Sequence, residues 1–182
     1  MDSASNTFQS IDIEKVIHNK NPRLAKALPG FIIRYLKKIL HQTVINKSLE
    51  ANKNVNGLDF VRNILKEFNA KINVSGLENL PETGRFIIAS NHPLGGLDGL
   101  ALMHVAGKVR KDIVFPVNDF LLNLPNLQNL FIPINKHGKN TENLDKLENA
   151  FKSDKLILYF PAGLCSRKIK GQICDLEWKK TF

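Results

Sequence analysis

The sequence lacks most of the features that assign a protein to a class at once. Its 182 residues include two cysteines, Cys165 and Cys174, which are too few for a disulfide framework and fit a reducing compartment. No apolar run approaches the roughly 20 residues that span a bilayer, and the polar residues 1–10 do not form a secretory signal. Histidine and cysteine are scattered without the spacing of metal ligands, so we expect no metal site.

Apolar side chains and positive charge are what the chain has in quantity. Apolar residues make up 43% of the sequence, which is enough for a sizeable core. The formal net charge of +9 indicates an anionic partner, either nucleic acid or an anionic membrane surface. No nucleic-acid-binding motif accompanies the charge. We therefore expect an anionic membrane surface, and not nucleic acid, as the partner.

Residues 31–45 are the local feature that supports a membrane surface. At the helical period, one narrow side of this segment is basic and the rest is apolar. The basic side consists of Arg34, Lys37, Lys38 and His41. Such a helix can lie in a membrane interface with its basic side toward anionic headgroups, or it can pack its apolar face on the domain. Both interpretations stay open, and we expect a peripheral protein at the cytoplasmic face of a membrane.

Short apolar runs alternate with helical patterns from residue 72 onward. Strands are predicted at residues 72–74, 86–89, 113–117, 132–134 and 155–160, and helices at 98–107 and 141–151. This alternation is typical of an α/β domain with a mostly parallel sheet and flanking helices. We therefore expect an N-terminal helical segment over residues 1–70, which includes the candidate membrane-interfacial helix, and an α/β core over residues 71–182.

The most informative stretch is Ser-Asn-His-Pro-Leu-Gly-Gly-Leu-Asp-Gly at residues 90–99. It joins the predicted strand at 86–89 to the next helix, so His92 lies in a strand-to-helix loop and Asp98 near the start of that helix. His92 can take a proton from an attacking hydroxyl or amine while Asp98 holds the other ring nitrogen and stabilises the imidazolium. The alternative is that Asp98 only caps the helix and His92 is a turn residue.

A second loop follows the predicted strand at 155–160. Its sequence, Phe-Pro-Ala-Gly-Leu-Cys-Ser-Arg at residues 160–167, combines turn-forming residues with small polar side chains and an arginine. Backbone N–H groups and the Arg167 guanidinium of such a loop can bind a phosphate or another anion. Both loops follow strand ends, and ligands of parallel sheets gather at the carboxyl ends of the strands.

These loops resemble the motifs of glycerolipid acyltransferases of the lysophosphatidate acyltransferase type. Asn91-His92 with Asp98 is similar to the family motif N-H-x-x-x-x-D, and residues 160–163 are similar to the start of F-P-E-G-T-R-S. Between them, residues 130–136 occupy the place of a family motif that ends in Asp-Arg. The resemblance covers roughly residues 72–170, with three motifs in the family's order.

The first motif departs from the main branch of that family. Five residues, not four, separate His92 from Asp98, and Gly95-Gly96 can absorb the extra residue. The second loop departs as well, because Ala162 stands where the family usually has glutamate. The form His-Pro-Leu-Gly-x-x-Asp is similar to a bacterial branch often labelled as hemolysins, some members of which acylate a lyso-ornithine or lyso-glycine lipid.

The resemblance implies an acyltransferase of membrane lipid biosynthesis. It implies transfer of a fatty acyl group from acyl-CoA or acyl carrier protein to a lyso-lipid (a lysophospholipid or a lyso-aminolipid), with His92 and Asp98 catalytic and no bound cofactor. The residues expected to bind substrate are Asn91, Gly95, Asn135, Lys136, Phe160, Pro161, Gly163, Ser166 and Arg167.

Two further expectations concern the C-terminal part of the chain and the absence of catalysis. Family members continue beyond the position of Phe182, so the resemblance implies a core truncated at its C-terminus, with no obvious partner for Trp178. The alternative to an enzyme is a non-catalytic peripheral module that binds membranes or lipids. The basic helix and the altered second loop favour this alternative, and the presence of both His92 and Asp98 weighs against it.

Overall fold

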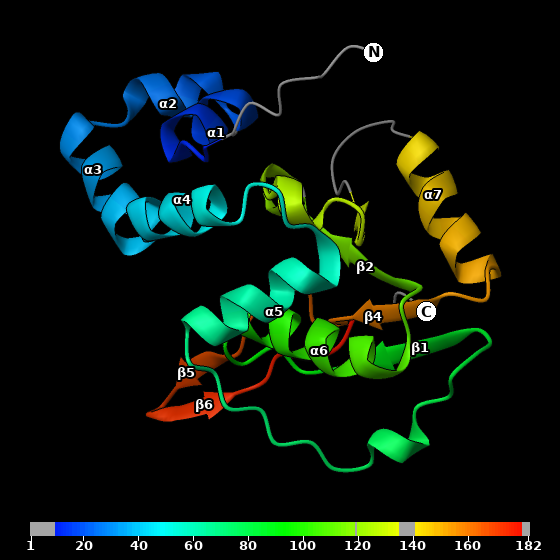
Figure 1. Cartoon of the computed structure of the whole chain (residues 1–182). Coiled ribbons are helices and arrows are strands. Elements are labelled where there is room, and N and C mark those ends of the chain that lie inside the picture. Colours follow the sequence, from blue (N-terminus) through cyan, green and yellow to red (C-terminus); the bar gives the residue numbers. More distant parts are fainter. Residues whose placement is uncertain (1–9, 119, 135–140, 180–182) are drawn as a thin grey trace.

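The computed structural model describes residues 10–118, 120–134 and 141–179. A layer of short helices at the N-terminus precedes an α/β part, and Figure 1 shows this layer on one side of the molecule. Within the described residues the layer consists of α1 (Ile13–Lys20), α2 (Pro22–Ala27), α3 (Gly30–Ile39) and α4 (Gln42–Ala51). Then α5 (Gly57–Glu67) leads into the α/β part.

Four parallel strands form the main sheet of the described chain. They are β1 (Phe86–Ala89), β2 (Ile113–Val117), β3 (Phe131–Pro133) and β4 (Leu156–Tyr159). The short 3₁₀ turn η1 (Leu77–Asn79) precedes β1. The connections between the strands contain α6 (Gly96–Val109), α7 (Thr141–Lys152) and the 3₁₀ turns η2 (Leu121–Asn123) and η3 (Pro125–Leu127). The strand order is β1-β4-β2-β3, so the last of these four strands along the chain inserts between the first two. The expected α/β fold with a mostly parallel sheet is confirmed.

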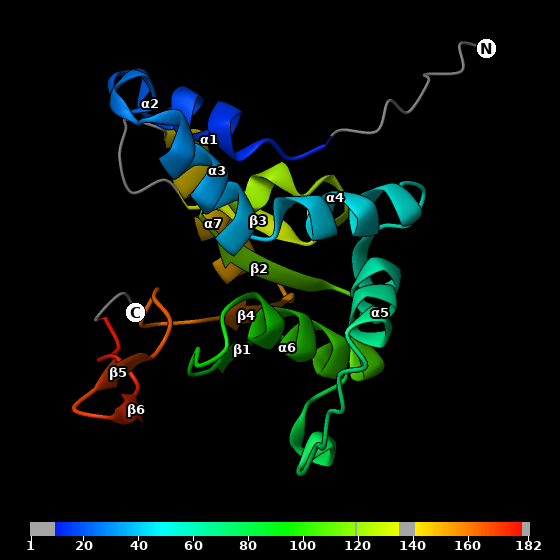
Figure 2. The same cartoon turned by 90° about the vertical axis from the view of Figure 1, so that its left-hand side faces the viewer.

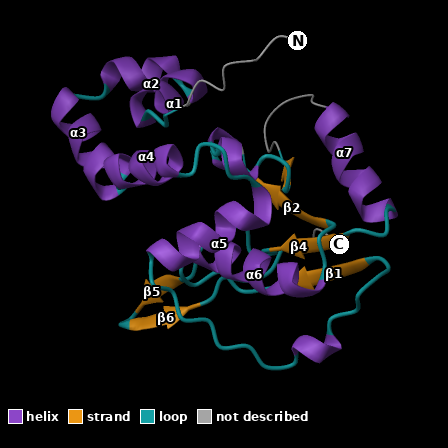
Figure 3. Ribbon diagram, in the orientation of Figure 1, coloured by secondary structure: helices purple, strands orange, loops and turns teal. Residues whose placement is uncertain are grey.

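Helices cover both faces of the sheet, as Figures 1 and 3 show. Side chains alternate along each strand. Phe115 of β2 and Leu158 of β4 therefore join the larger core on the side of α5 and α6. Val114 and Ile157, one residue before each of them, join the smaller core beneath α7. This two-sided burial explains why the strands are continuous apolar runs in the sequence.

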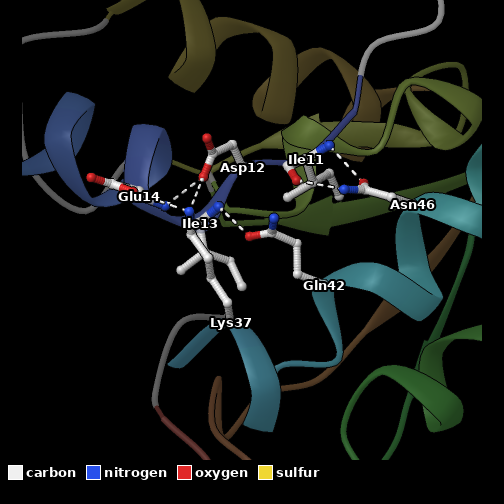
Figure 4. A network of polar contacts seen from close by, with 7 residues as sticks. All are labelled: Ile11, Asp12, Ile13, Glu14, Lys37, Gln42 and Asn46. Carbon is white, nitrogen blue, oxygen red and sulfur yellow. Dashed lines mark hydrogen bonds and ion pairs between the residues drawn. The ribbon is translucent and has the colours of Figure 1, made fainter. Parts of the chain in front are cut away.

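Apolar contacts attach the N-terminal layer to the rest of the protein, and polar contacts hold the layer itself together. Ile11 and Leu49 belong to the same core as α5 and the sheet. The Asn46 side chain donates to the Ile11 carbonyl and accepts from the Ile11 amide, both at 2.8 Å, as Figure 4 shows. The Ile13 amide donates to Gln42 Oε1 at 3.0 Å. Residues from both sides of position 70 thus share one core, and the division into two segments there remains a prediction.

The expected single helix over residues 31–45 is wrong. The structure ends α3 at Ile39 and begins α4 at Gln42, because His41 adopts a left-handed backbone conformation with φ of 51°. A second expectation, a strand at residues 72–74, is also wrong, since these residues pair with no strand of the described sheet. The remaining predicted strands and helices form within one or two residues of the expected bounds.

A β-hairpin follows the second loop and was missed by the sequence analysis. β5 (Arg167–Ile169) pairs antiparallel with β6 (Gln172–Cys174). Lys170 and Gly171 form the turn with φ values of 48° and 88°, the paired positive values that suit a two-residue hairpin. Figure 2 shows the hairpin on the side of the molecule away from the N-terminal helices. Gly171 was the available signal, but three-residue strands carry little periodicity.

Arg110 fixes the amino ends of three strands. Its side chain is 2% exposed and makes two hydrogen bonds to the Asp112 carboxylate, at 2.9 and 2.5 Å. It also donates to the backbone carbonyls of Gly84 and Asp154, which precede β1 and β4. The hydrogen bonds from Arg110 lower the pKa of Asp112 below its ordinary value. This polar cluster, in which Arg110 is buried and Asp112 is exposed, lies at the opposite end of the strands from the two loops.

Candidate active site

The pairing of β1 with β4 brings the two loops together. Ala89 and Tyr159, the last residues of these strands, are direct partners in the sheet. The next residue, Ser90, donates its backbone N–H to the Tyr159 carbonyl at 3.0 Å. Both loops therefore leave the same edge of the sheet from neighbouring positions. This is the place where parallel α/β sheets bind ligands.

His92 and Asp98 lie side by side at this edge. The distance between His92 Nδ1 and Asp98 Oδ2 is 3.3 Å, and the side chains are 19% and 15% exposed. The contact has the distance of an ion pair but not the angles of a hydrogen bond, so Nδ1 is buried without a hydrogen-bond partner among the described residues. Asp98 Oδ2 accepts the Leu94 amide at 2.6 Å. The carboxylate therefore holds the loop closed while it faces the imidazole.

Gly95 makes this closed loop possible. Its φ of 73° and ψ of −131° lie in a region that side chains other than glycine rarely adopt. Its carbonyl accepts the Asp98 amide at 3.1 Å, and α6 begins at Gly96, two residues before the expected start at Asp98. This turn lies at the glycine pair that the sequence analysis offered as the place for the extra residue. A Cβ at Gly95 would meet Cys165 Sγ at 3.6 Å, so the two loops are in contact here.

Aromatic residues pack against one face of the imidazole ring. The His92 ring stacks on Phe160, with 4.0 Å between centroids and 19° between planes. Phe160 packs edge-on against Phe115 of β2, at 5.3 Å between ring centroids. Pro161 is fully buried, and Gly163, at φ of 64°, donates its amide to the Phe160 carbonyl at 2.9 Å. The second loop is thus a rigid wall of the site.

The other expected binding residues have different places in the structure. The Ser166 amide donates to the His92 carbonyl at 3.0 Å, which ties the second loop to the first. Arg167 begins β5 with an exposed side chain that makes no hydrogen bond or ion pair to any other residue within the described ranges. Asn135 and Lys136 lie outside the described residues.

Two residues near the site were missed by the sequence analysis. Asp175 follows β6 and accepts hydrogen bonds from Asn91 Nδ2 at 2.6 Å and from Ser166 Oγ at 2.5 Å. Trp178 Nε1 donates to Asn91 Oδ1 at 3.2 Å, so the expectation that Trp178 has no obvious partner is wrong. No motif marked either residue, because both reach the site only through the turn of the β5–β6 hairpin.

The fold and the site define an α/β protein with a partly buried histidine–carboxylate pair at the carboxyl ends of parallel strands. The chain belongs to the acyltransferase family, whose profile matches residues 15–182. No solved structure matches the chain significantly.

Two curated relatives are both named lyso-glycine lipid O-acyltransferase. The protein from Bacteroides thetaiotaomicron is 47% identical over 174 residues, and that from Phocaeicola vulgatus is 48% identical over 174 residues. These alignments cover 94% of this chain but 64% and 62% of the two relatives. The chain therefore spans less than two thirds of the length of the curated relatives it matches.

Proposed function

We propose that this protein transfers a fatty acyl group to the hydroxyl of a lyso-aminolipid. The observation that carries the proposal is the geometry of His92, whose Nδ1 faces the Asp98 carboxylate while its ring stacks on Phe160. This arrangement leaves Nε2 as the ring nitrogen for a substrate. A structural role alone does not require a histidine held in this way at a ligand-binding edge of the sheet.

His92 acts as a general base in this proposal. The acceptor hydroxyl attacks the carbonyl carbon of an acyl thioester as its proton moves to His92 Nε2. Asp98 keeps the other ring nitrogen protonated and stabilises the imidazolium. The new C–O bond forms, the C–S bond breaks, and the imidazolium returns the proton to the leaving thiolate. An ester and a free thiol are released, and His92 is neutral again.

The choice of acceptor rests on the relatives and on charge. Both curated relatives carry the name lyso-glycine lipid O-acyltransferase, which supports a lyso-aminolipid acceptor. Arg167 is one residue from Ser166, whose amide bonds the His92 carbonyl, and its guanidinium has no other described partner. Arginine is the side chain best suited to bind a carboxylate or a phosphate. We assign Arg167 to the anionic group of the acceptor or the donor.

The acyl donor is a thioester substrate, acyl-CoA or acyl carrier protein, and no bound cofactor takes part in the proposed reaction. Each donor carries phosphate, and the net charge of +9 favours such anionic partners. Assays with both donors distinguish them.

An anionic membrane surface is the second partner that we propose, through α3. Phe31, Tyr35 and Ile39 form an exposed apolar stripe along this helix, with 64%, 61% and 45% of their surface exposed. At about 100° per residue, the exposed Arg34 and Lys38 border this stripe. Apolar side chains beside basic ones are typical of helices that lie in an anionic interface.

The structure changes which basic residues serve this surface. Lys37 Nζ contacts Asp12 Oδ1 at 3.2 Å and Glu14 Oε2 at 3.0 Å, as Figure 4 shows. Its charge is thus paired within the N-terminal layer, on the side of α3 that includes the buried Ile33. Among the described residues, no helix combines the length and the apolarity needed to cross a bilayer. We propose a peripheral enzyme at the cytoplasmic face, with Arg34 and Lys38 toward the lipid headgroups.

The alternative function is a lipid-binding module without catalysis. The exposed stripe on α3 favours it, whereas a module that only binds lipid has no use for the His92–Asp98 pair. A direct assay separates the two: the purified chain is mixed with acyl-CoA or acyl carrier protein donors and a panel of lyso-glycine, lyso-ornithine and lysophospholipid acceptors. Mass spectrometry should detect an acylated lyso-aminolipid. Vesicle binding without any acylated product would establish the alternative.

A further inference from the structure

Asp175 joins the two loops of the site through both oxygens of one carboxylate. Oδ2 accepts from the Asn91 side chain and Oδ1 from the Ser166 hydroxyl. These are short bonds to a charged acceptor, a class about twice as strong as neutral hydrogen bonds. Asn91 lies immediately before His92 in the first loop, and Ser166 lies immediately before β5 in the second.

Together with a backbone hydrogen bond, these bonds form a closed ring of contacts that includes His92. The Ser166 amide donates to the His92 carbonyl at 3.0 Å, so Ser166 contacts the first loop through its backbone and Asp175 through its side chain. Asp175 returns to the first loop at Asn91, which is covalently bonded to His92. The peptide that carries the imidazole is therefore held on both sides. Trp178 adds a bond to the other end of the Asn91 amide.

We propose that Asp175 is a positioning residue for the reaction, and this inference rests on the proposed function. Its carboxylate fixes the backbone of His92 so that the ring stays against Asp98 and Phe160. Asp175 is itself solvent-exposed, so its two bonds add little to the free energy of unfolding. Their main effect is on the local position of the first loop. A displacement of about 1 Å in a catalytic group can cost roughly 100-fold in rate.

The structure also offers variants that separate positioning from charge. In Asp175→Asn the amide can still accept from Asn91 and donate to the Ser166 hydroxyl, so both connections survive without the charge. In Asp175→Ala both connections are lost. Glu177→Gln is the matched control, because Glu177 is exposed, lies two residues away and removes the same charge.

The experiment compares these variants of the full chain in the acyl-transfer assay. We expect Asp175→Ala to lower kcat up to about 100-fold with little change in KM, because misplacement of the base affects the chemical step. Asp175→Asn should recover most of this loss, and Glu177→Gln should match wild type. Equal losses in Asp175→Ala and Asp175→Asn would show that charge matters and would overturn the positioning role. A loss confined to KM would show a substrate contact instead.

A second measurement does not depend on turnover. The ring signals of the five histidines are recorded by NMR, and His92→Ala identifies the signal of His92. Asp175→Ala should shift or broaden this signal, and Asp175→Asn should leave it in place. An unchanged His92 signal in Asp175→Ala overturns the inference, even if wild type is inactive toward every acceptor and the proposed function fails. If Asp175→Ala does not fold, Ser166→Ala removes the hydrogen bond between the second loop and Asp175 and should produce the same shift.

Discussion

In the site, polar side chains tie two loops together around one histidine, whereas in the N-terminal layer they tie residues 11–14 to α3 and α4 and leave an apolar stripe exposed on α3. Asp175 and Ser166 connect the loops that carry His92 and Phe160. Figure 4 shows the second network, in which Asn46, Gln42 and Lys37 hold residues 11–14.

The difference lies in what each network leaves free. Around His92, the contacts join the two loops and fix the backbone that carries the ring. Around α3, they pair Lys37 and leave Phe31, Tyr35 and Ile39 exposed. In both regions the hydrogen bonds position other side chains. In the site they position His92, and in the N-terminal layer they orient α3 so that its apolar stripe stays exposed. Substitutions in the two regions should therefore affect different measurements.

The largest expected effect is on His92. His92→Ala should remove most acyl transfer, because general base catalysis typically contributes about 10²–10⁴-fold. Circular dichroism should show an intact fold, and vesicle binding should not change. Turnover close to that of wild type would exclude His92 as the base.

Asp98→Asn should have a smaller effect of the same kind. The amide can present its N–H to His92 Nδ1 and favour the wrong tautomer, so kcat should fall, by less than in His92→Ala, if Asp98 only orients the ring. The same oxygen, Oδ2, accepts the Leu94 amide, so an N–H turned toward Nδ1 gives up that bond and should also lower the melting temperature. The measurement is kcat beside the melting temperature. A lower melting temperature with unchanged kcat would show that Asp98 only stabilises the start of α6 and takes no part in catalysis.

The N-terminal layer is tested by the double variant Arg34→Gln with Lys38→Gln. Each basic residue near an anionic surface contributes about 1 kcal/mol, so binding to anionic vesicles should weaken roughly 30-fold. Lys66→Gln with Lys71→Gln is the matched control, since both lysines are exposed and lie outside α3. Co-sedimentation with vesicles measures binding. Equal losses in the two double variants would show that net charge, not the α3 surface, drives binding.

The smallest expected effect concerns the Arg110 cluster, a polar network at the other end of the strands that we assign to stability alone. Arg110 lowers the pKa of Asp112 in the folded state. The stability from this pair is therefore present above the ordinary aspartate pKa and is lost as pH falls through the lower folded pKa. Wild type should melt at a higher temperature than Asp112→Asn at pH 7, and the difference should shrink below about pH 4. A constant difference across this range would contradict the assignment.

Much of the fold could be predicted because it depends on local patterns. The apolar runs of β1, β2 and β4 and the helical spacing in α6 and α7 are properties of neighbouring residues, and these elements formed close to the expected positions. His92, Asp98 and the residues of the second loop could also be placed at strand ends for this reason. The break at His41 could not be predicted, because a left-handed residue between two helical patterns leaves the apolar spacing almost unchanged.

Periodicity and turn residues act over a few positions, so the class of fold, the two loops and the candidate pair could be read from the sequence. Only the tertiary structure decided that β4 inserts beside β1 and so brings Phe160 against the His92 ring. It also decided that Asp175 returns to Asn91 and that Lys37 is paired away from the outer face of α3. The physical reason is the same in each case: these contacts join residues that are distant in the chain, and their formation depends on strand pairing and core packing rather than on local propensity.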